Sequence, residues 1–259
     1  MIPTRATVAT MGRFESKVVL VTGSSSGIGE ATARRFAAEG AAVVVNSSTS
    51  VDAGRAVADD LVSQGAVASY VQADVSDAEQ RRHLVEATLS EHGRLDVLVN
   101  NAGVTKVIPH HDLDAVTEEV FRRILDVNLI GTFELTKLAL DHLRDTGDGA
   151  VVNITSVAGV RPTGSSVPYA VSKAALNHLT VLLANVSGLA VRVNAVAPGL
   201  IRTPWTADWG PLHDLMGERA PLGRSGEPDE IAGAVVDVAA NRYLTGQVLL
   251  VDGGLSIRT

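Results

Sequence analysis

The sequence predicts an α/β protein: one doubly wound, parallel sheet of about seven strands, flanked by helices on both faces. Short valine-rich runs alternate with longer helical patterns from residue 17 onwards, which is typical of parallel sheets with right-handed crossovers. The length of 259 residues suits one large domain. The 46% hydrophobic content includes only 3% aromatic residues, so the predicted core is aliphatic, as in sheets buried on both faces.

The strands are predicted from short apolar runs whose brevity and valine content favour strand over buried helix. No linker or repeat separates them, so residues 12–259 are expected to form a single domain. Residues 1–11 contain Pro3 and no hydrophobic period, and they are expected to form a flexible tail. The predicted strands are residues 18–21, 42–45, 68–72, 95–99, 150–154, 191–196 and 247–251, and the predicted helices are residues 27–39, 52–63, 77–92, 117–143, 169–187 and 228–239.

Charge and composition exclude several classes of function. The formal net charge of −7 and the lack of a Lys/Arg-rich run disfavour nucleic acid and anionic membranes as partners. The absence of cysteine excludes disulfides, zinc–thiolate sites and a cysteine nucleophile, and it fits a cytoplasmic protein. The apolar runs are too short to span a bilayer, and the first residues lack the pattern of a secretory signal. We therefore expect a cytoplasmic protein with no metal site.

A glycine-rich turn follows the first predicted strand, with the spacing G-x-x-x-G-x-G. Glycines let backbone N–H groups approach a pyrophosphate, and the dipole of the following helix favours the negative charge. The turn is not a P-loop, because no Lys-Ser/Thr pair follows the last glycine. A glycine cluster alone can be a purely structural turn, but after the first strand of a βαβ pattern it favours dinucleotide binding. The candidate contacts are Gly23, Ser25, Ser26, Gly27, Ile28 and Gly29.

Three motifs together resemble the short-chain dehydrogenase/reductase family, in particular its 3-oxoacyl-acyl-carrier-protein reductases. They are Thr22-Gly-x-x-x-Gly-Ile-Gly29, Asn100-Asn101-Ala102-Gly103 after the fourth strand, and Pro198-Gly199 after the sixth. The resemblance covers residues 12–255 and implies a Rossmann-like fold and an enzyme. Its reaction would be hydride transfer between a nicotinamide cofactor and a carbonyl/alcohol pair.

Tyr169 and Lys173 are four residues apart, so on a helix their side chains share a face. A free tyrosine titrates near pH 10, and a cation about 4 Å away is worth at most roughly 4 kcal/mol, or about three pKa units. That effect would bring Tyr169 towards the range of a general acid. Taken alone, the pair is more often an exposed lysine beside a half-buried tyrosine.

Ser156 and Asn128 favour the catalytic interpretation. The hydroxyl of Ser156, after the fifth strand, can donate to a substrate carbonyl. Asn128 is an amide within a predicted helix, where it either holds partners or bends the helix. The resemblance implies that Asn128, Ser156, Tyr169 and Lys173 form a catalytic tetrad. In it, Asn128 would hold a relay water and Lys173 would also bind the nicotinamide ribose.

The resemblance implies further cofactor contacts. Asn101, Ala102 and Gly103 would lie along the adenine ribose. Asp74 and Val75 would frame the adenine, although an Asp at this place is otherwise a common turn or cap residue. The nicotinamide end would be held by Pro198, Gly199, Ile201 and Thr203.

The end of the second strand favours NADP(H) over NAD(H). Sites that prefer NAD place an acid there, about twenty residues beyond the glycines. Here Ser47 and Ser48 begin a hydroxyl-rich stretch with no carboxylate to repel a 2′-phosphate. Ser26 departs from the arginine of many NADP-dependent relatives, and Arg55 could substitute for it.

The substrate and the assembly are predicted only in outline. The resemblance makes residues around Trp205 and Trp209 a variable flap, whose apolar groups either line a substrate pocket or anchor the flap. The expected substrate is a small carbonyl or alcohol, with 3-oxoacyl thioesters among the candidates. An inactive nucleotide sensor is the alternative, but such proteins usually lack the tyrosine or lysine. The helix with Leu176, Leu179 and Leu182 carries an aliphatic stripe, so a homo-oligomer, a dimer or a tetramer, is expected.

Overall fold

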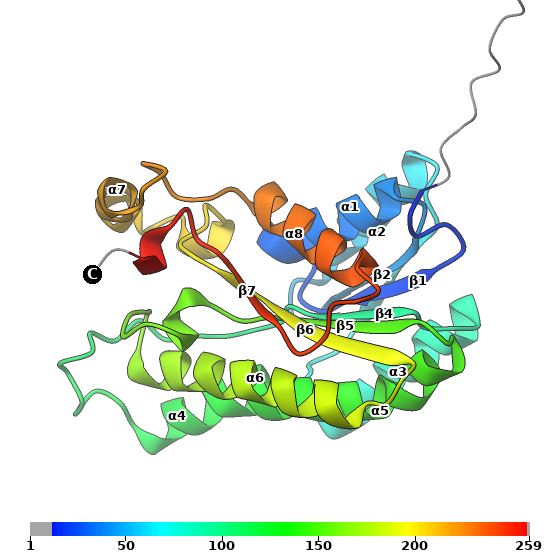
Figure 1. Cartoon of the computed structure of the whole chain (residues 1–259), viewed down its shortest axis with the longest axis horizontal. Helices are drawn as coiled ribbons and strands as arrows, with labels where there is room; N and C mark the ends of the chain where they lie inside the picture. Colours follow the sequence, from blue (N-terminus) through cyan, green and yellow to red (C-terminus); the bar gives the residue numbers. More distant parts are fainter. Residues whose placement is uncertain (1–11, 258–259) are drawn as a thin grey trace, which may run out of the picture.

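The computed structural model describes residues 12–257, which form a seven-stranded parallel sheet in the order β3-β2-β1-β4-β5-β6-β7 (Figure 1). This confirms the predicted doubly wound, Rossmann-like fold, because the chain moves outwards from β1 first in one direction and then in the other. The expectation for residues 1–11 lies outside the described residues. The strands are β1 (Val18–Val21), β2 (Ala42–Ser47), β3 (Ala68–Gln72), β4 (Val97–Asn100), β5 (Gly149–Ile154), β6 (Val191–Pro198) and β7 (Val248–Val251).

Helices cover both faces of the sheet. One face is packed by α1 (Gly27–Ala38), α2 (Val51–Ser63) and α8 (Pro228–Ala240), and the other by α3 (Ala78–His92), α5 (Thr132–Asp145) and α6 (Val167–Val186) (Figure 1). The remaining helical segments are α4 (Glu118–Leu125), a π-helical turn (Asp126–Gly131), α7 (Gly210–Arg219) and three short 3₁₀ turns at Val157–Gly159, Pro204–Thr206 and Leu255–Ile257.

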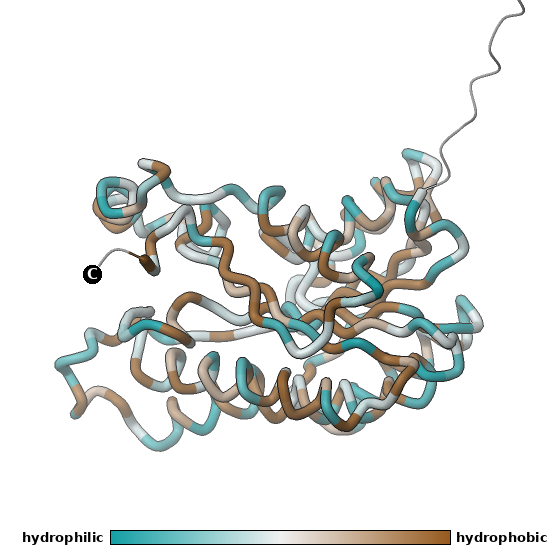
Figure 2. Tube along the Cα trace, in the orientation of Figure 1, coloured by the Kyte–Doolittle hydropathy of each residue, from teal (hydrophilic) through white to brown (hydrophobic). Residues whose placement is uncertain are grey.

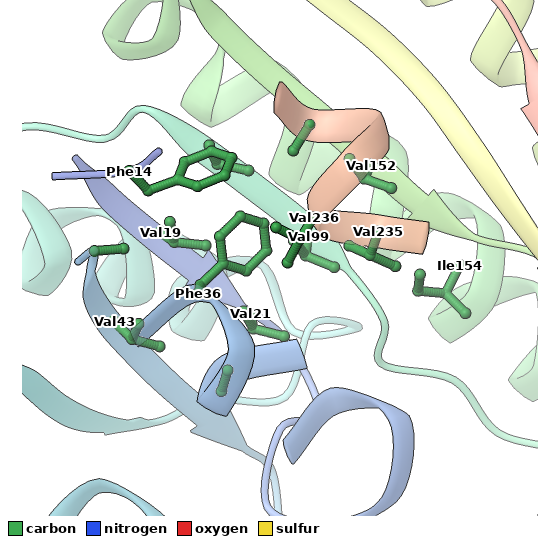
Figure 3. Packing of buried hydrophobic residues seen from close by; sticks show 14 of the residues in the cluster. Phe14, Val19, Val21, Phe36, Val43, Val99, Val152, Ile154, Val235 and Val236 are labelled. Carbon is green, nitrogen blue, oxygen red and sulfur yellow. The ribbon is translucent and has the colours of Figure 1, made fainter. Parts of the chain in front are cut away.

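The core is aliphatic and divides into two clusters, one on each face. Successive residues of a strand point to opposite faces, so Val19 and Val21 pack under α1 and α8 while Leu20 packs towards α3 and α5. Figure 3 shows Phe14 and Phe36 beside the valines of the first cluster, and their rings meet edge-on with centroids 4.8 Å apart. Hydrophobic residues run along the strands and inward helix faces in Figure 2. The core thereby holds the strand ends in one rigid frame.

The predicted helix over residues 117–143 is interrupted by the π-helical turn that contains Asn128. Gly131 ends this turn, and a Cβ there would lie 2.6 Å from the carbonyl oxygen of Val75. The glycine therefore permits a close approach to the loop after β3. The sequence did not predict α7, because its apolar residues follow no clear helical period. None of the helices within residues 12–257 has the length and apolar character needed to cross a membrane.

Candidate active site

The loops that follow β1, β4, β5 and β6 surround a cavity of about 860 Å³ at the carboxyl ends of the strands. This is where ligands bind in open α/β sheets, because the chain diverges there in two directions. Most of the residues predicted from the motifs line it. They are Gly23, Ser26, Gly27, Ile28, Gly29, Asn101, Ala102, Gly103, Ser156, Tyr169, Lys173, Pro198, Gly199, Ile201 and Thr203.

The glycine-rich turn has the backbone of a phosphate cradle. Gly23 and Gly27 have φ values of 61° and 59°, which favour glycine. A Cβ on Gly29 would lie 2.3 Å from the carbonyl oxygen of Gly23, so only glycine fits at this crossing. Ser26 precedes the first turn of α1 and its hydroxyl caps none of the helix N–H groups. The N-terminus of α1 thus faces the cavity with donors that suit a pyrophosphate.

Buried amides hold this turn in place. Asn101 donates through Nδ2 to the carbonyl oxygens of Thr22 and Gly23, both at 2.9 Å. Asn46 accepts from the N–H of Gly23 at 3.3 Å, and its Nδ2 donates to the carbonyls of Val71 and Ala73. The ends of four strands, β1 to β4, are therefore cross-linked beneath the turn, which holds the turn in its shape before a ligand binds.

Tyr169, Ser156 and Lys173 meet on one wall of the cavity. Lys173 is 4% exposed, and its ammonium group donates to the carbonyl of Ile154 at 2.8 Å. The ammonium nitrogen lies 5.7 Å from the centre of the Tyr169 ring. Ser156 begins the 3₁₀ turn after β5, and its hydroxyl accepts from the N–H of Ala158 at 3.1 Å. The arrangement brings a phenol, a hydroxyl and a cation to one surface.

Burial changes the acidity of both titratable groups. It raises the pKa of the Tyr169 phenol, and the neighbouring Ser156 hydroxyl partly opposes this by lowering it. Burial lowers the pKa of Lys173 to about 8, because the charged ammonium is disfavoured away from water. At neutral pH Tyr169 is therefore protonated and Lys173 still carries its charge. The direction for Tyr169 is opposite to the one expected from its spacing to Lys173, because burial outweighs any effect of the cation.

Asn128 lies behind this wall and is fully buried. Its Oδ1 accepts from the N–H of Val104 at 2.8 Å, and its Nδ2 donates to the carbonyl of Val104 and to the hydroxyl of Ser172. The Ser172 hydroxyl in turn donates to the carbonyl of Tyr169 at 2.7 Å. Asn128 thus joins the loop after β4 to α6. A Cβ on Gly103 would lie 3.4 Å from its Oδ1 and 3.7 Å from the ammonium of Lys173, so both groups border the same point.

Five predicted cofactor contacts lie off the cavity wall: Ser25, Ser47, Ser48, Asp74 and Val75. The buried Ser47 hydroxyl pairs with the Tyr70 hydroxyl at 2.8 Å and donates to the carbonyl of Ser50 at 3.0 Å, while Ser48 is exposed.

Asp74 makes the turn contacts that the sequence offered as the alternative to an adenine contact. Its Oδ1 accepts from the N–H and hydroxyl of Ser76, and its Oδ2 pairs with Arg123 at 3.2 Å. Burial alone would raise the pKa of this carboxyl, but the bonds from Ser76 and Arg123 bring it below its usual value.

The segment after β6 supplies the apolar side of the cavity. Trp205, Trp209, Leu212 and Met216 all line it, and Trp205 meets Tyr169 edge-on with ring centroids 6.3 Å apart. Residues that the motifs did not indicate complete the wall, because no local signal marks the loops that carry them. They are, among others, Val107, Ile108, His110, Pro162 and Ser165.

Comparisons with known proteins agree with this geometry. Residues 23–256 match the family model described as enoyl-(acyl carrier protein) reductase. The chain is 54% identical to a Streptomyces violaceoruber protein assigned as ketoacyl reductase 2 of the granaticin polyketide synthase, covering 93% of this chain and 96% of the relative. It is 39% identical to a 3-oxoacyl-[acyl-carrier-protein] reductase of Thermotoga maritima, covering 95% and 100%.

Solved structures resemble the whole domain. A gluconate 5-dehydrogenase from Burkholderia cenocepacia, in complex with NADP and tartrate, superposes with a TM-score of 0.87 at 32% identity and covers 96% of this chain and 99% of that one. A Burkholderia xenovorans protein assigned to the short-chain dehydrogenases/reductases gives 0.88 at 39% identity, covering 93% and 98%.

Proposed function

The chain belongs to the short-chain dehydrogenase/reductase family and is an NAD(P)-dependent oxidoreductase of carbonyl and alcohol substrates, and on this premise we propose that it is an NADP(H)-dependent ketone reductase in which Tyr169 is the proton donor. The observation that carries the proposal is the meeting of Tyr169, Ser156 and Lys173 on the wall of the cavity that the glycine-rich turn also lines. The cofactor supplies the hydride when bound.

The side chains divide the remaining work. Ser156 donates a hydrogen bond to the substrate carbonyl oxygen and holds it beside Tyr169. Tyr169, which is protonated at neutral pH, gives its phenolic proton to that oxygen as the oxygen gains negative charge. The buried ammonium of Lys173, 5.7 Å from the ring centre, stabilises the phenolate that remains. Asn128 holds the loop after β4 and α6 at a fixed separation through two hydrogen bonds with Val104 and one to Ser172, whose hydroxyl donates in turn to the carbonyl of Tyr169.

The glycine-rich turn and the Asn101–Gly103 segment fit the pyrophosphate and ribose of a dinucleotide. Ile201 and Thr203 line the same cavity, and the Thr203 side chain lies against the glycine-rich turn, 3.3 Å from an ideal Cβ on Gly27. We assign the preference for NADP(H) to the exposed hydroxyl residues 48–50 and to Arg55, also exposed, on the first turns of α2. No carboxylate stands in residues 46–51 to repel a 2′-phosphate. The 3-oxoacyl reductases among the relatives and the NADP complex support the same choice.

Replacing Tyr169 with Phe tests the proposed function directly. The ring is kept but the proton is lost, so NADPH-dependent reduction of a 3-oxo ester such as ethyl acetoacetate should fall about 10²- to 10⁴-fold. NADPH binding, followed by fluorescence, should remain. Tyr243→Phe is the matched control, because Tyr243 is fully exposed and does not line the cavity. Retention of more than about a tenth of the rate in Tyr169→Phe would remove Tyr169 from the proposed role.

The cofactor assignment has its own test. We expect a higher kcat/KM with NADPH than with NADH, and the reverse preference would overturn it. Arg55→Ala should weaken the preference for NADPH and leave the NADH rate unchanged, since NADH has no 2′-phosphate for Arg55 to meet.

We further propose that the protein is a homo-oligomer. Apolar side chains are exposed on one helical layer, at Ile130 and Phe133 near the start of α5 and at Val181, Leu182 and Val186 on α6. Exposed apolar groups gathered on neighbouring helices favour burial against a second copy. Light scattering at micromolar concentration should give a multiple of 27.0 kDa, and a monomer would refute the proposal.

A further inference from the structure

His110 is a polar residue of the cavity wall that the proposed proton transfer does not use. Its Nε2 atom is buried, and within residues 12–257 it has no hydrogen-bond partner. Buried polar atoms are nearly always paired, because an unpaired one loses its bonds to water without compensation. His110 lines the cavity through other atoms, so a turn of its ring when a ligand binds would let a ligand oxygen supply the missing partner.

The backbone around His110 is held in a defined shape. Pro109 to Asp112 form a turn closed by the N–H of Asp112 and the carbonyl of Pro109 at 2.9 Å. The same loop is tied to the loop after β5, since Ile108 donates to the carbonyl of Ser165 at 2.8 Å and the Thr105 and Ser165 hydroxyls are 2.6 Å apart. His110 is therefore presented by two joined loops, which lowers the entropy lost when it binds.

The rest of this wall is uncharged and mostly apolar, with the hydroxyl groups of Thr163, Ser165 and Thr206 among its residues. Val107, Pro162, Trp209, Leu212 and Met216 line the cavity together with His110. Among the described residues that line it, Lys173 is the only lysine, arginine, aspartate or glutamate, and its ammonium already donates to Ile154. The pyrophosphate of the cofactor has the N–H groups at the start of α1, but a carboxylate or phosphate on the substrate would meet no such donors and no further cation beside His110.

We propose that the substrate is an uncharged, largely apolar ketone that carries a second oxygen, a hydroxyl or carbonyl, which hydrogen-bonds to Nε2 of His110. This rests on the proposed function, and it makes His110 a specificity-determining residue. A ketone with the second oxygen pairs the buried nitrogen, whereas one without it leaves that nitrogen unpaired.

A matched set of bicyclic ketones tests the proposal: 1-tetralone, 5- and 7-hydroxy-1-tetralone, and a 1-tetralone with a ring carboxylate. NADPH consumption gives kcat/KM for each with the wild type, with His110→Phe and with His111→Phe. His111 is the control, because it is the exposed neighbour in the same turn and does not line the cavity. The ratio of hydroxylated to plain ketone is compared between variants, so differences in intrinsic ketone reactivity cancel.

For at least one hydroxytetralone, the kcat/KM ratio of hydroxylated to plain ketone should be about tenfold higher in the wild type than in His110→Phe. A factor of about ten is the effect expected of one well-placed hydrogen bond to a buried group. His111→Phe should keep the wild-type ratio, and the carboxylate should be the poorest substrate. His110→Gln, which retains hydrogen-bonding atoms, should recover part of the ratio. NADPH binding to each variant verifies that the cavity is intact.

Equal ratios in the wild type and His110→Phe, or a preference for the carboxylate, would overturn the proposal. Ethyl acetoacetate separates the two levels of failure. If the wild type reduces it in a Tyr169-dependent manner but reduces no tetralone, the substrate class is wrong and the proposed reductase function stands. If neither the ester nor any tetralone is reduced, the reductase function itself fails.

Discussion

The two walls of the cavity are built in different ways. The wall with Tyr169 and Lys173 belongs to α6, which buries seven of its twenty residues, including Lys173, Asn177 and Thr180. The opposite wall belongs to α7, which buries only His213 and Gly217 of its ten residues. The α6 wall is therefore part of the core, whereas the α7 wall lies at the surface of the protein.

Buried polar bonds fasten the α6 wall to the sheet. Asn153 on β5 donates to Thr180 on α6 and accepts from Asn100 on β4, both at 2.9 Å. Asn100 also donates to Thr136 on α5 at 3.0 Å. Each bond is sheltered from water, and a chain of such bonds specifies one arrangement of strands and helices. The proposed proton-transfer groups therefore have little freedom to move.

The α7 wall depends on one histidine. His213 bonds through Nδ1 to the Ser225 hydroxyl at 2.9 Å and through Nε2 to the carbonyl of Thr206 at 3.2 Å. Around it, Leu212 and Leu215 remain about 40% exposed and Trp205 48%. Elements with few buried contacts open at low cost in free energy. The comparison teaches that the proposed proton-transfer groups lie on the wall with many buried bonds, whereas the apolar residues proposed to contact the substrate lie on the wall with few.

Removing the ammonium of Lys173 should have the largest effect on the rigid wall. Lys173→Met should lower kcat at least about a hundredfold, because a buried cation no longer favours the ionised tyrosine. Steady-state kinetics with NADPH checks this. Lys137→Met, at an exposed pair with Glu134 on α5, should leave the rate unchanged. Near-normal turnover in Lys173→Met would contradict the proposed role of the lysine.

The same variant should differ from the wild type in the pH dependence of stability. The pKa of Lys173 is lowered from 10.5 to about 8 by burial, so below pH 8 the folded state carries a buried charge that the unfolded state keeps in water. Between pH 8 and about 10.5 the unfolded state binds more protons, so the free energy of unfolding of the wild type rises with pH. Over this pH range, the free energy of unfolding of the wild type should increase by about 3 kcal/mol more than that of Lys173→Met. Urea unfolding across this range measures it, and parallel curves for the two proteins would disprove it.

Asn128→Ala should loosen the rigid wall. The substitution leaves a cavity at a fully buried position and removes the side-chain partners of the half-buried N–H and carbonyl of Val104, at a cost of about 2–4 kcal/mol in the free energy of unfolding. Urea unfolding tests this against Asn185→Ala, an exposed position near the end of α6 that should cost less than about 0.5 kcal/mol. A loss at Asn128 no greater than at Asn185 would mean that the amide does not hold the wall.

His213→Leu should affect the α7 wall, and its effect on the kinetics should be the smallest of the four. The loss of two bonds frees α7, so KM for a bulky ketone should rise about three- to tenfold while kcat stays within about twofold. His83→Leu, on the exposed face of α3, is the control. A fall in kcat without a change in KM would mean instead that α7 supports the proton transfer.

Local signals accounted for much of the fold and of the candidate site. Short, mostly apolar runs predicted all seven strands, and the signal is strongest for inner strands such as β1 and β4, which are buried on both faces and therefore apolar along almost their whole length. The glycine-rich turn could also be predicted from the sequence, because the positive φ at Gly23 and Gly27 favours glycine at both positions. Asp74 was less determined, because a carboxylate that ends a strand serves a turn and a ligand equally well.

The sequence by itself therefore determined the sheet, the glycine-rich turn and the spacing of Tyr169 and Lys173, because each depends on residues close in the chain. Only the tertiary structure decided that Asn128 would lie in a π-helical turn, that α7 would be a helix, and that His110 would face the cavity. His110 is placed by a loop paired with residues about 55 positions away, at Ser165. Long-range packing of this kind leaves no period or motif in the sequence, because its free energy comes from contacts that exist only in the folded chain.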